Sequence, residues 1–123
     1  MGTFAAGQVV VLPFSFSDLS RKKLRPALLL ADAGRGDWIA CQITSNPYAD
    51  AHAITLAESE FAEGGLQRLS YLRPAKLFTC HESLPVDTVG LLNADSIKNF
   101  VGPPFASIIS GNISHRETPL PRR

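Results

Sequence analysis

Residues 26–44, PALLLADAGRGDWIACQIT, decide the fold that the sequence predicts. Two short apolar runs, at residues 26–31 and 38–44, flank the turn-forming stretch DAGRGD at residues 32–37. Short apolar runs bounded by Gly and Asp are typical of strands. We therefore expect an antiparallel hairpin, with Pro26 at the start of its first strand, where a missing N–H can be tolerated.

Further strands are expected on both sides of this hairpin. They cover residues 9–14, 52–56 and 69–80. The first is too uniformly apolar to have a solvated face, and Pro74 marks a bulge or an edge in the last. The segments between are interpreted as a polar basic loop, a loop around Asn46-Pro47 and an acidic surface connection. These cover residues 15–24, 45–50 and 58–65.

One helix is expected late in the chain. Asn93 is a plausible N-cap, and Asp95 in the first turn complements the helix dipole. The apolar residues that follow at a spacing of three and four form one face. They are Ile97, Phe100 and Val101. Gly102-Pro103-Pro104 then ends the helix, so five or six short strands and one helix predict a small, mostly antiparallel barrel.

Length and composition agree with an ordinary globular domain. A chain of 123 residues with 45% hydrophobic and 19% charged residues favours one domain, which we assign to residues 1–109 with a mobile tail at 110–123. Twelve basic residues against eleven acidic ones argue against a protein that coats nucleic acid through general basicity. Four of the twelve nevertheless fall within residues 21–25.

The cysteines and the apolar stretches predict a cytoplasmic protein with no membrane association. Residues 1–7 contain no basic residue, and no apolar stretch approaches the roughly 18 residues of a membrane span. Cys41 and Cys80 lie in apolar runs and are expected to be reduced thiols that pack as small hydrophobes. Cys80-His81 lacks a second Cys or His at ligand spacing, so no metal site is expected.

The sequence contains no obvious acid–base or cofactor constellation. The histidines, His52, His81 and His115, are far apart, and no Gly-rich phosphate loop precedes a helix. The carboxylates Glu58, Glu60 and Glu63 crowd one connection, a pattern that favours a solvated loop over paired catalytic groups. An enzyme built on this sequence would therefore work with a cation and hydroxyl groups, without a metal or a cofactor.

Arg25 and Thr44 are such a cation and hydroxyl. In an antiparallel hairpin the start of one strand lies beside the end of its partner, so Arg25 and Thr44 are expected to face each other at one rim of the sheet. A guanidinium can clamp a phosphate with two hydrogen bonds while a hydroxyl donates to another phosphoryl oxygen. The alternative is structural: Arg25 would pair with Asp18, and Thr44 would only complete a strand end.

Five stretches carry a resemblance to a known family. They are residues 8–20 (QVVVLPFSFSDLS), 23–30 (KLRPALLL), 40–46 (ACQITSN), 64–66 (GGL) and 70–77 (SYLRPAKL). The most specific pieces are the Arg25-Pro26 step into an apolar strand and the segment QITS at residues 42–45. In this order and spacing, over about residues 7–101, the sequence resembles the MazF/PemK toxins of type II toxin–antitoxin systems.

The resemblance implies an SH3-like barrel with a C-terminal helix packed on it, acting as a homodimer. It implies a sequence-selective, metal-independent endoribonuclease that cleaves single-stranded RNA by attack of the 2′-hydroxyl. A cognate antitoxin encoded nearby would silence it. The catalytic pair of the family carries over onto Arg25 and Thr44, and its mobile loop onto residues 15–24.

Residues around this pair are assigned to RNA binding. Basic side chains would follow the RNA backbone, and Phe16 or Tyr48 would stack on a base. Arg73 and Lys76 are weaker phosphate candidates, with an exposed strand charge as the alternative. The complete set is Ser15, Phe16, Ser17, Arg21, Lys22, Lys23, Ser45, Asn46, Tyr48, Arg73 and Lys76.

Two other functions are compatible with the same fold. One is a gyrase poison resembling CcdB, which acts through a C-terminal helix; the break at residues 102–104 and the Pro- and Arg-rich end of the sequence argue against it. The other is a catalytically silent SH3-like module that binds RNA or a peptide. The presence of both Arg25 and Thr44 favours the enzyme, although a fold does not by itself fix a function.

Overall fold

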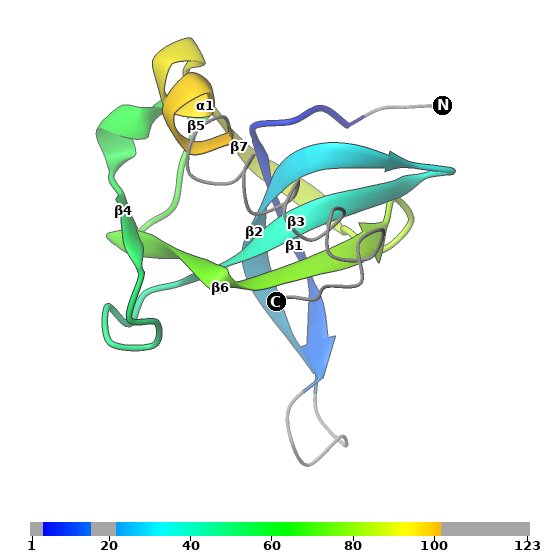
Figure 1. The fold of residues 1–123 in the computed structure, drawn as a ribbon, viewed down its shortest axis with the longest axis horizontal. Coiled ribbons are helices and arrows are strands. Elements are labelled where there is room, and N and C mark those ends of the chain that lie inside the picture. Colours follow the sequence, from blue (N-terminus) through cyan, green and yellow to red (C-terminus); the bar gives the residue numbers. More distant parts are fainter. Residues whose placement is uncertain (1–3, 16–21, 102–123) are drawn as a thin grey trace, which may run out of the picture.

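The apolar runs of the sequence form one antiparallel sheet with a helix beside it. The computed structural model describes residues 4–15 and 22–101 (Figure 1). Within these residues the elements are β1 (Gln8–Ser15), β2 (Lys22–Gly34), β3 (Asp37–Thr44), β4 (Ile54–Leu56), the 3₁₀ turn η1 (Glu58–Glu60), β5 (Phe61–Gly64), β6 (Ser70–His81), β7 (Asp87–Leu92) and α1 (Ala94–Val101).

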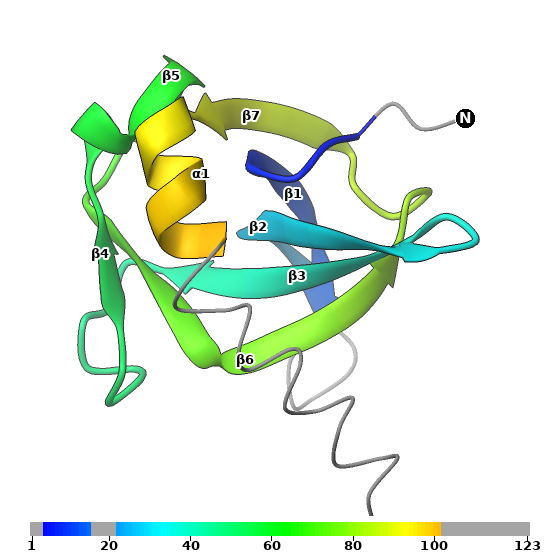
Figure 2. The ribbon, with the colours of Figure 1, turned by 45° about the horizontal axis from the view of Figure 1, so that its top comes forward.

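The sheet curls into a half-barrel. Its strands follow the order β4-β6-β3-β2-β1-β7-β5, and neighbouring strands are antiparallel. The two end strands are β4 and β5, and α1 lies at the side between them (Figure 2). The expected mainly β fold, an SH3-like antiparallel barrel with a C-terminal helix, is confirmed, with the sheet open between its end strands.

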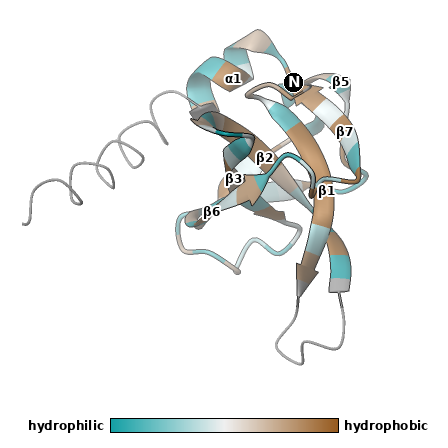
Figure 3. Cartoon of the chain, turned by 90° about the vertical axis from the view of Figure 1, so that its right-hand side faces the viewer, coloured by the Kyte–Doolittle hydropathy of each residue, from teal (hydrophilic) through white to brown (hydrophobic). Residues whose placement is uncertain are grey.

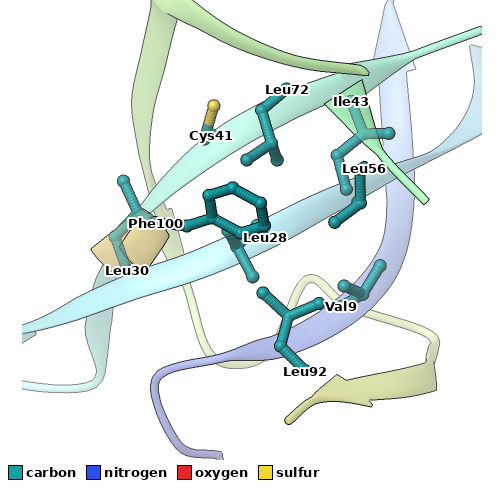
Figure 4. Packing of buried hydrophobic residues seen from close by; sticks show 9 residues of the cluster. All are labelled: Val9, Leu28, Leu30, Cys41, Ile43, Leu56, Leu72, Leu92 and Phe100. Carbon is teal, nitrogen blue, oxygen red and sulfur yellow. The ribbon is translucent and has the colours of Figure 1, made fainter. Parts of the chain in front are cut away.

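Both faces of the central strands are buried. One cluster lies between the inner face of the sheet and α1 (Figure 4), and it consists of Val9, Leu28, Leu30, Cys41, Ile43, Leu56, Leu72, Leu92 and Phe100. The cluster on the other face consists of Val10, Leu12, Ala27, Leu29, Trp38, Ala40 and Cys80. Figure 3 shows the resulting hydrophobic colouring along much of β1. A strand buried on both faces has no polar alternation, which explains the uniform apolar run at residues 9–14.

The central hairpin is confirmed, but β2 is longer at both ends than predicted. Residues 22–24, assigned to the basic loop, are paired in register with residues 13–15 of β1. Pro26 is therefore inside β2, opposite Val11, and precedes Ala27, the first residue of β2 that is paired with β3. Its missing N–H interrupts no pair between β2 and β3. At the other end the turn shrinks to Arg35 and Gly36.

Two strands, β5 and β7, were not expected. The acidic connection at residues 58–65 contains η1 and β5, and β5 pairs with β7. The two backbones approach so closely that glycine is required at two positions, and these glycines weaken the strand pattern in the sequence. A Cβ at Gly64, where φ is +63°, would lie 2.1 Å from the Val89 carbonyl oxygen, and one at Gly90 would lie 2.7 Å from the Phe61 ring. The strand predicted at residues 52–56 is shorter and spans β4 alone.

Of the two possibilities predicted at Pro74, a bulge or an edge, the bulge is confirmed. The pairing of β3 with β6 passes from Cys41 opposite Leu77 to Ile43 opposite Leu72, so residues 73–76 bulge out of the register. A bulge bends its strand. On one side of this bulge, Tyr71 and Leu72 of β6 pair with both β3 and β4.

The helix begins as predicted. The Asn93 Oδ1 accepts the Ser96 N–H at 2.8 Å, which is an N-cap. Asn93 also ties the helix to η1: its Nδ2 donates to the Ser59 carbonyl at 2.9 Å and its N–H to the Glu60 carbonyl at 2.8 Å. Ile97 and Phe100 pack on the inner cluster. The expected helix end at residues 102–104 and the tail at 110–123 lie outside the described residues.

No helix in the described part of the chain has the length and apolar character needed to span a membrane.

Candidate functional site

The hairpin brings Arg25 and Thr44 to one end of the sheet. In the pairing of β2 with β3, Ala27 lies opposite Gln42. Continuing this register by two residues on each strand places Arg25 opposite Thr44. Both residues are partly buried, and both line a pocket of about 440 Å³. We call this cavity the Arg25 pocket.

The Arg25 pocket is electropositive. Its polar lining residues are Lys23, Arg25, Thr44, Ser45, Gln67, Arg68 and Ser70. Leu24, Pro26, Ile43 and Leu66 form its apolar part. Among these described lining residues three are cations and none is a carboxylate, so the cavity suits an anionic ligand such as a phosphate group. Gln67 and Arg68 come from the connection between β5 and β6 and were missed in the sequence, since nothing local links that connection to Arg25.

The turn after β3 orients the Thr44 hydroxyl. The Thr44 Oγ1 accepts the Asn46 N–H at 3.1 Å, and the Asn46 Oδ1 accepts the Tyr48 N–H at 2.9 Å. Short Thr and Asn side chains commonly hold turns in this way. Because a hydroxyl can accept and donate at the same time, Thr44 keeps its O–H for a group bound in the pocket.

Arg73 anchors the connection that follows this turn. Its Nη1 donates to the Gln42 Oε1 and its Nη2 to the Ala49 carbonyl, both at 2.8 Å. Its Nε lies 3.9 Å from the Asp50 Oδ2, and the Arg73 side chain is 19% exposed. Arg73 is therefore neither the exposed strand charge considered above nor part of the Arg25 pocket.

The partner carboxylate of Arg73 is buried and satisfied. The Asp50 side chain is 2% exposed, and its two oxygens accept the His52 N–H at 2.8 Å and the Ala75 N–H at 3.1 Å. The hydrogen bond from His52 first, and then those from Ala75 and the charge of Arg73, lower the pKa of Asp50 against the opposing effect of burial. Asp50 is thus a fixed negative charge that joins the β3–β4 connection to the bulge of β6.

The structure gathers some of the other predicted RNA-binding residues and separates the rest. Lys23 and Ser45 line the Arg25 pocket, and Asn46 lies in the adjoining turn. Tyr48 is outside the pocket lining on the same connection, with 91% of its surface exposed. Lys76 is exposed on the bulge of β6 and does not line the pocket. Ser15 and Lys22 are paired at the ends of β1 and β2. Phe16, Ser17 and Arg21 lie outside the described residues, as does Asp18.

The two cysteines have the packing role that was expected. Both thiols are free and buried, one in each cluster. Burial raises the pKa of Cys41 to about 12 and also raises the pKa of Cys80. Among residues 4–15 and 22–101, no group of three or more His, Cys, Asp or Glu side chains is arranged to hold a metal ion.

Comparison with known proteins gives matches at the level of structure. No family model matches the sequence, and no curated protein matches it at a significant level. A chain of a MazE–MazF complex from Deinococcus radiodurans superimposes with a TM-score of 0.61, over 89% of this chain and 98% of the other, at 21% identity. The chain has the MazF fold.

Two further MazF-fold structures agree with this assignment. An endoribonuclease in complex with its cognate antitoxin, from a mycobacterial species, covers 85% of this chain and 93% of its own, with a TM-score of 0.55 at 14% identity. The toxin MazF-mt6 of Mycobacterium tuberculosis covers 85% and 96%, with a TM-score of 0.53 at 17% identity. In the present MazF fold, the Arg25 pocket lies where β2 begins and β3 ends.

Proposed function

We propose that this protein is the toxin of a type II toxin–antitoxin system. It is a sequence-selective endoribonuclease that cuts single-stranded RNA without a metal ion. The observation that supports the proposal is the Arg25 pocket, a cavity lined by both Arg25 and Thr44 together with the cations Lys23 and Arg68. The likeness to a structure described as an endoribonuclease supports it at the level of the fold.

The chemistry follows from what these groups do to a phosphodiester. The ribose 2′-hydroxyl attacks the adjacent phosphorus, and the bond from phosphorus to the 5′-oxygen breaks. The 2′-hydroxyl loses one proton and the leaving 5′-oxygen gains one, so the reaction balances. The products are a 2′,3′-cyclic phosphate and a 5′-hydroxyl. Negative charge on the phosphoryl oxygens rises in the transition state, and preorganised donors stabilise it. A guanidinium is a hydrogen-bond donor with no acceptor, so Arg25 acts by electrostatic stabilisation, while Thr44 donates to the same group.

Neighbouring residues bind the rest of the RNA. Lys23 and Ser45 extend the Arg25 pocket, and the basic stretch at residues 21–25 attracts the backbone. Tyr48, which is almost fully exposed, offers a ring on which an unpaired base can stack. Arg73 stabilises the connection that carries Tyr48 through its hydrogen bond to the Ala49 carbonyl.

The proposed partner is an antitoxin that covers this pocket, and the proposed assembly is a homodimer in the cytoplasm. The matching structures include a MazE–MazF complex and an endoribonuclease bound to its cognate antitoxin. A free ribonuclease harms its host, so an inhibitor that occludes Arg25 is required in the cell.

The deciding experiment replaces Arg25 by Lys. Lys keeps the charge but loses the planar two-pronged donor, so Arg25→Lys and Arg25→Ala should both abolish RNA cleavage and growth arrest. Arg35→Lys is the matched control, because Arg35 is exposed in the turn at the opposite end of the hairpin and outside the Arg25 pocket. An Arg25→Lys protein that cuts RNA as fast as the parent would remove the proposed centre.

Mapping the RNA ends tests the reaction itself. Fragments should carry 5′-hydroxyl and cyclic or 3′-phosphate ends, and the rate should be unchanged in EDTA. Activity that disappears on chelation and returns with Mg²⁺ contradicts the proposed chemistry. Growth arrest with intact RNA and inhibited gyrase supercoiling would favour the gyrase poison, and RNA binding without cleavage would favour the silent module.

A further inference from the structure

A second, smaller pocket adjoins the Arg25 pocket. It has a volume of about 200 Å³, and Leu66, Gln67 and Arg68 line both cavities. The two cavities therefore adjoin each other at the connection between β5 and β6. A ligand that places an anionic group beside Arg25 can reach the second pocket with its next group.

The walls of the second pocket combine apolar surface with a few polar groups. Leu56, which is 2% exposed, and Phe61 contribute apolar wall, and Leu69 adds an exposed apolar side chain at 55%. Glu58 contributes a carboxylate. The volume is below the roughly 300–1,000 Å³ of pockets for drug-sized molecules, so it suits a single small ring system.

The wall that carries Glu58 and Phe61 is held in place. Asn93 at the start of α1 fixes η1 through the carbonyls of Ser59 and Glu60. The Phe61 ring is seated so close to Gly90 that a Cβ there would lie 2.7 Å from the ring. This wall of the pocket is therefore held in place by the fold, which reduces the entropy cost of binding against it.

The three acidic residues of this region have separate positions, although the sequence groups them. Glu60 accepts a hydrogen bond from the Ser96 hydroxyl, and Glu63 lies on β5 outside both pockets. Of the three, Glu58 is the one that lines either of these two pockets. Glu58 is exposed, as expected for a solvated connection, and its side chain also lines the second pocket.

We propose that the second pocket is a subsite for one unstacked base of the RNA, next to the phosphate in the Arg25 pocket. The proposal rests on the function proposed above. Arg68, on the shared wall, neutralises the backbone between the two sites, and Phe61 and Leu69 contact the base. The Glu58 carboxylate only accepts hydrogen bonds, so it selects a base with an exocyclic amino group over uracil.

The test compares Glu58→Gln with Glu63→Gln. Both carboxylates are exposed, so neither replacement endangers the fold, and both variants lose one charge. Short RNA substrates that differ only in the bases flanking the cleaved bond are cut by each protein, and kcat/KM is measured for each base. We expect the parent and Glu63→Gln to prefer an amino-bearing base at one flanking position by about ten- to hundredfold. Glu58→Gln should lose most of this preference while it still cleaves the uracil substrate.

The outcomes separate this inference from the function on which it rests. An unchanged base preference in Glu58→Gln, with cleavage intact, overturns the base subsite alone. Weakened antitoxin binding in Glu58→Gln with an unchanged base preference assigns the pocket to a protein partner and also overturns it. No cleavage by the parent overturns the proposed function and the subsite together.

Discussion

Thr44 combines a local structural bond with a position in the Arg25 pocket. Its oxygen holds the turn through the Asn46 N–H, and its hydroxyl proton remains for a ligand. A Ser hydroxyl at this position can make both hydrogen bonds. Val can make neither, although its side chain has almost the same shape as that of Thr. The two replacements therefore separate the hydroxyl from the volume of the side chain.

At this residue we predict that Thr44→Val lowers the single-turnover cleavage rate by about 10²-fold, the lower end for a lost preorganised donor. Thr44→Ser should retain most of the rate, and the loss in Thr44→Val should be smaller than that in Arg25→Ala. Equal rates for the parent and Thr44→Val would show that the hydroxyl takes no part in the reaction.

The Asp50 carboxylate makes stability depend on pH. Its hydrogen bonds lower its pKa on folding, so the folded protein binds this proton less readily than the unfolded chain does. The resulting stabilisation is complete above the unfolded value of about 3.9 and is lost as the pH falls through the lower folded pKa. Below that range the carboxylic acid has lost its charge and the bond to Arg73 weakens.

We expect Asp50→Asn to lower the free energy of unfolding by about 2 kcal/mol at pH 7, the range for hydrogen bonds to a charged group. The difference in unfolding free energy between Asp50→Asn and the parent should become smaller below about pH 4. Urea unfolding at several pH values measures this, with Glu63→Gln as the control for an exposed carboxylate. A gap that stays constant down to pH 2 contradicts the assigned role of Asp50.

At the scale of elements, the pair of β5 and β7 depends on a close backbone approach. Gly64 has φ of +63°, and a Cβ there would collide with the Val89 carbonyl, which itself accepts the Gly65 N–H at 3.1 Å. Gly34 is a matched control, because its φ of +91° is also left-handed but a Cβ there would meet no atom within 4 Å.

We predict that Gly34→Ala lowers the free energy of unfolding by about 1–2 kcal/mol, because the backbone conformation alone is unfavourable for Ala. Gly64→Ala should cost more and should detach β5 from β7. Urea unfolding gives the two costs, and amide exchange should increase at Gly65 in the Gly64 variant only. Equal costs for the two variants would mean that the edge accommodates the side chain.

The sequence predicted the elements whose signals are local. The hairpin at residues 26–44, the bulge at Pro74 and the Asn93 cap each follow from a few neighbouring residues, and each is confirmed. The strands β5 and β7 were missed because glycines that permit their close approach weaken a strand pattern. The sequence also predicted that Arg25 lies near Thr44 but not that Arg68 lies near them, because Arg68 reaches the pocket only through the packing of strands that are distant in the sequence.

The charge of Arg73 was assigned to the surface for a related reason. Its partners, Gln42 and Ala49, are more than twenty residues away, and no periodic pattern predicts such contacts. A buried network of this kind emerges only after β3 and β6 are paired.

At the scale of the whole molecule, RNA and the antitoxin should compete for the Arg25 pocket. On the proposed function, RNA and antitoxin are both attracted to the cations of the Arg25 pocket. A labelled, uncleavable RNA should therefore leave the Arg25→Ala protein as the product of the neighbouring gene is added. Raising the salt concentration should weaken RNA binding steeply, because phosphate contacts release counterions. It should weaken an antitoxin that also buries apolar surface less. A stable complex that holds both ligands at full occupancy would indicate allosteric inhibition instead.

The half-barrel ends in its two shortest strands, with three residues in β4 and four in β5. An edge strand exposes unpaired amide and carbonyl groups on which a foreign strand can grow, and short edges offer few of them. The open sheet is therefore a poor template for fibrils. Copies of the protein that meet at these sheet edges find few groups to pair with, so we expect the protein to stay dispersed at high concentration.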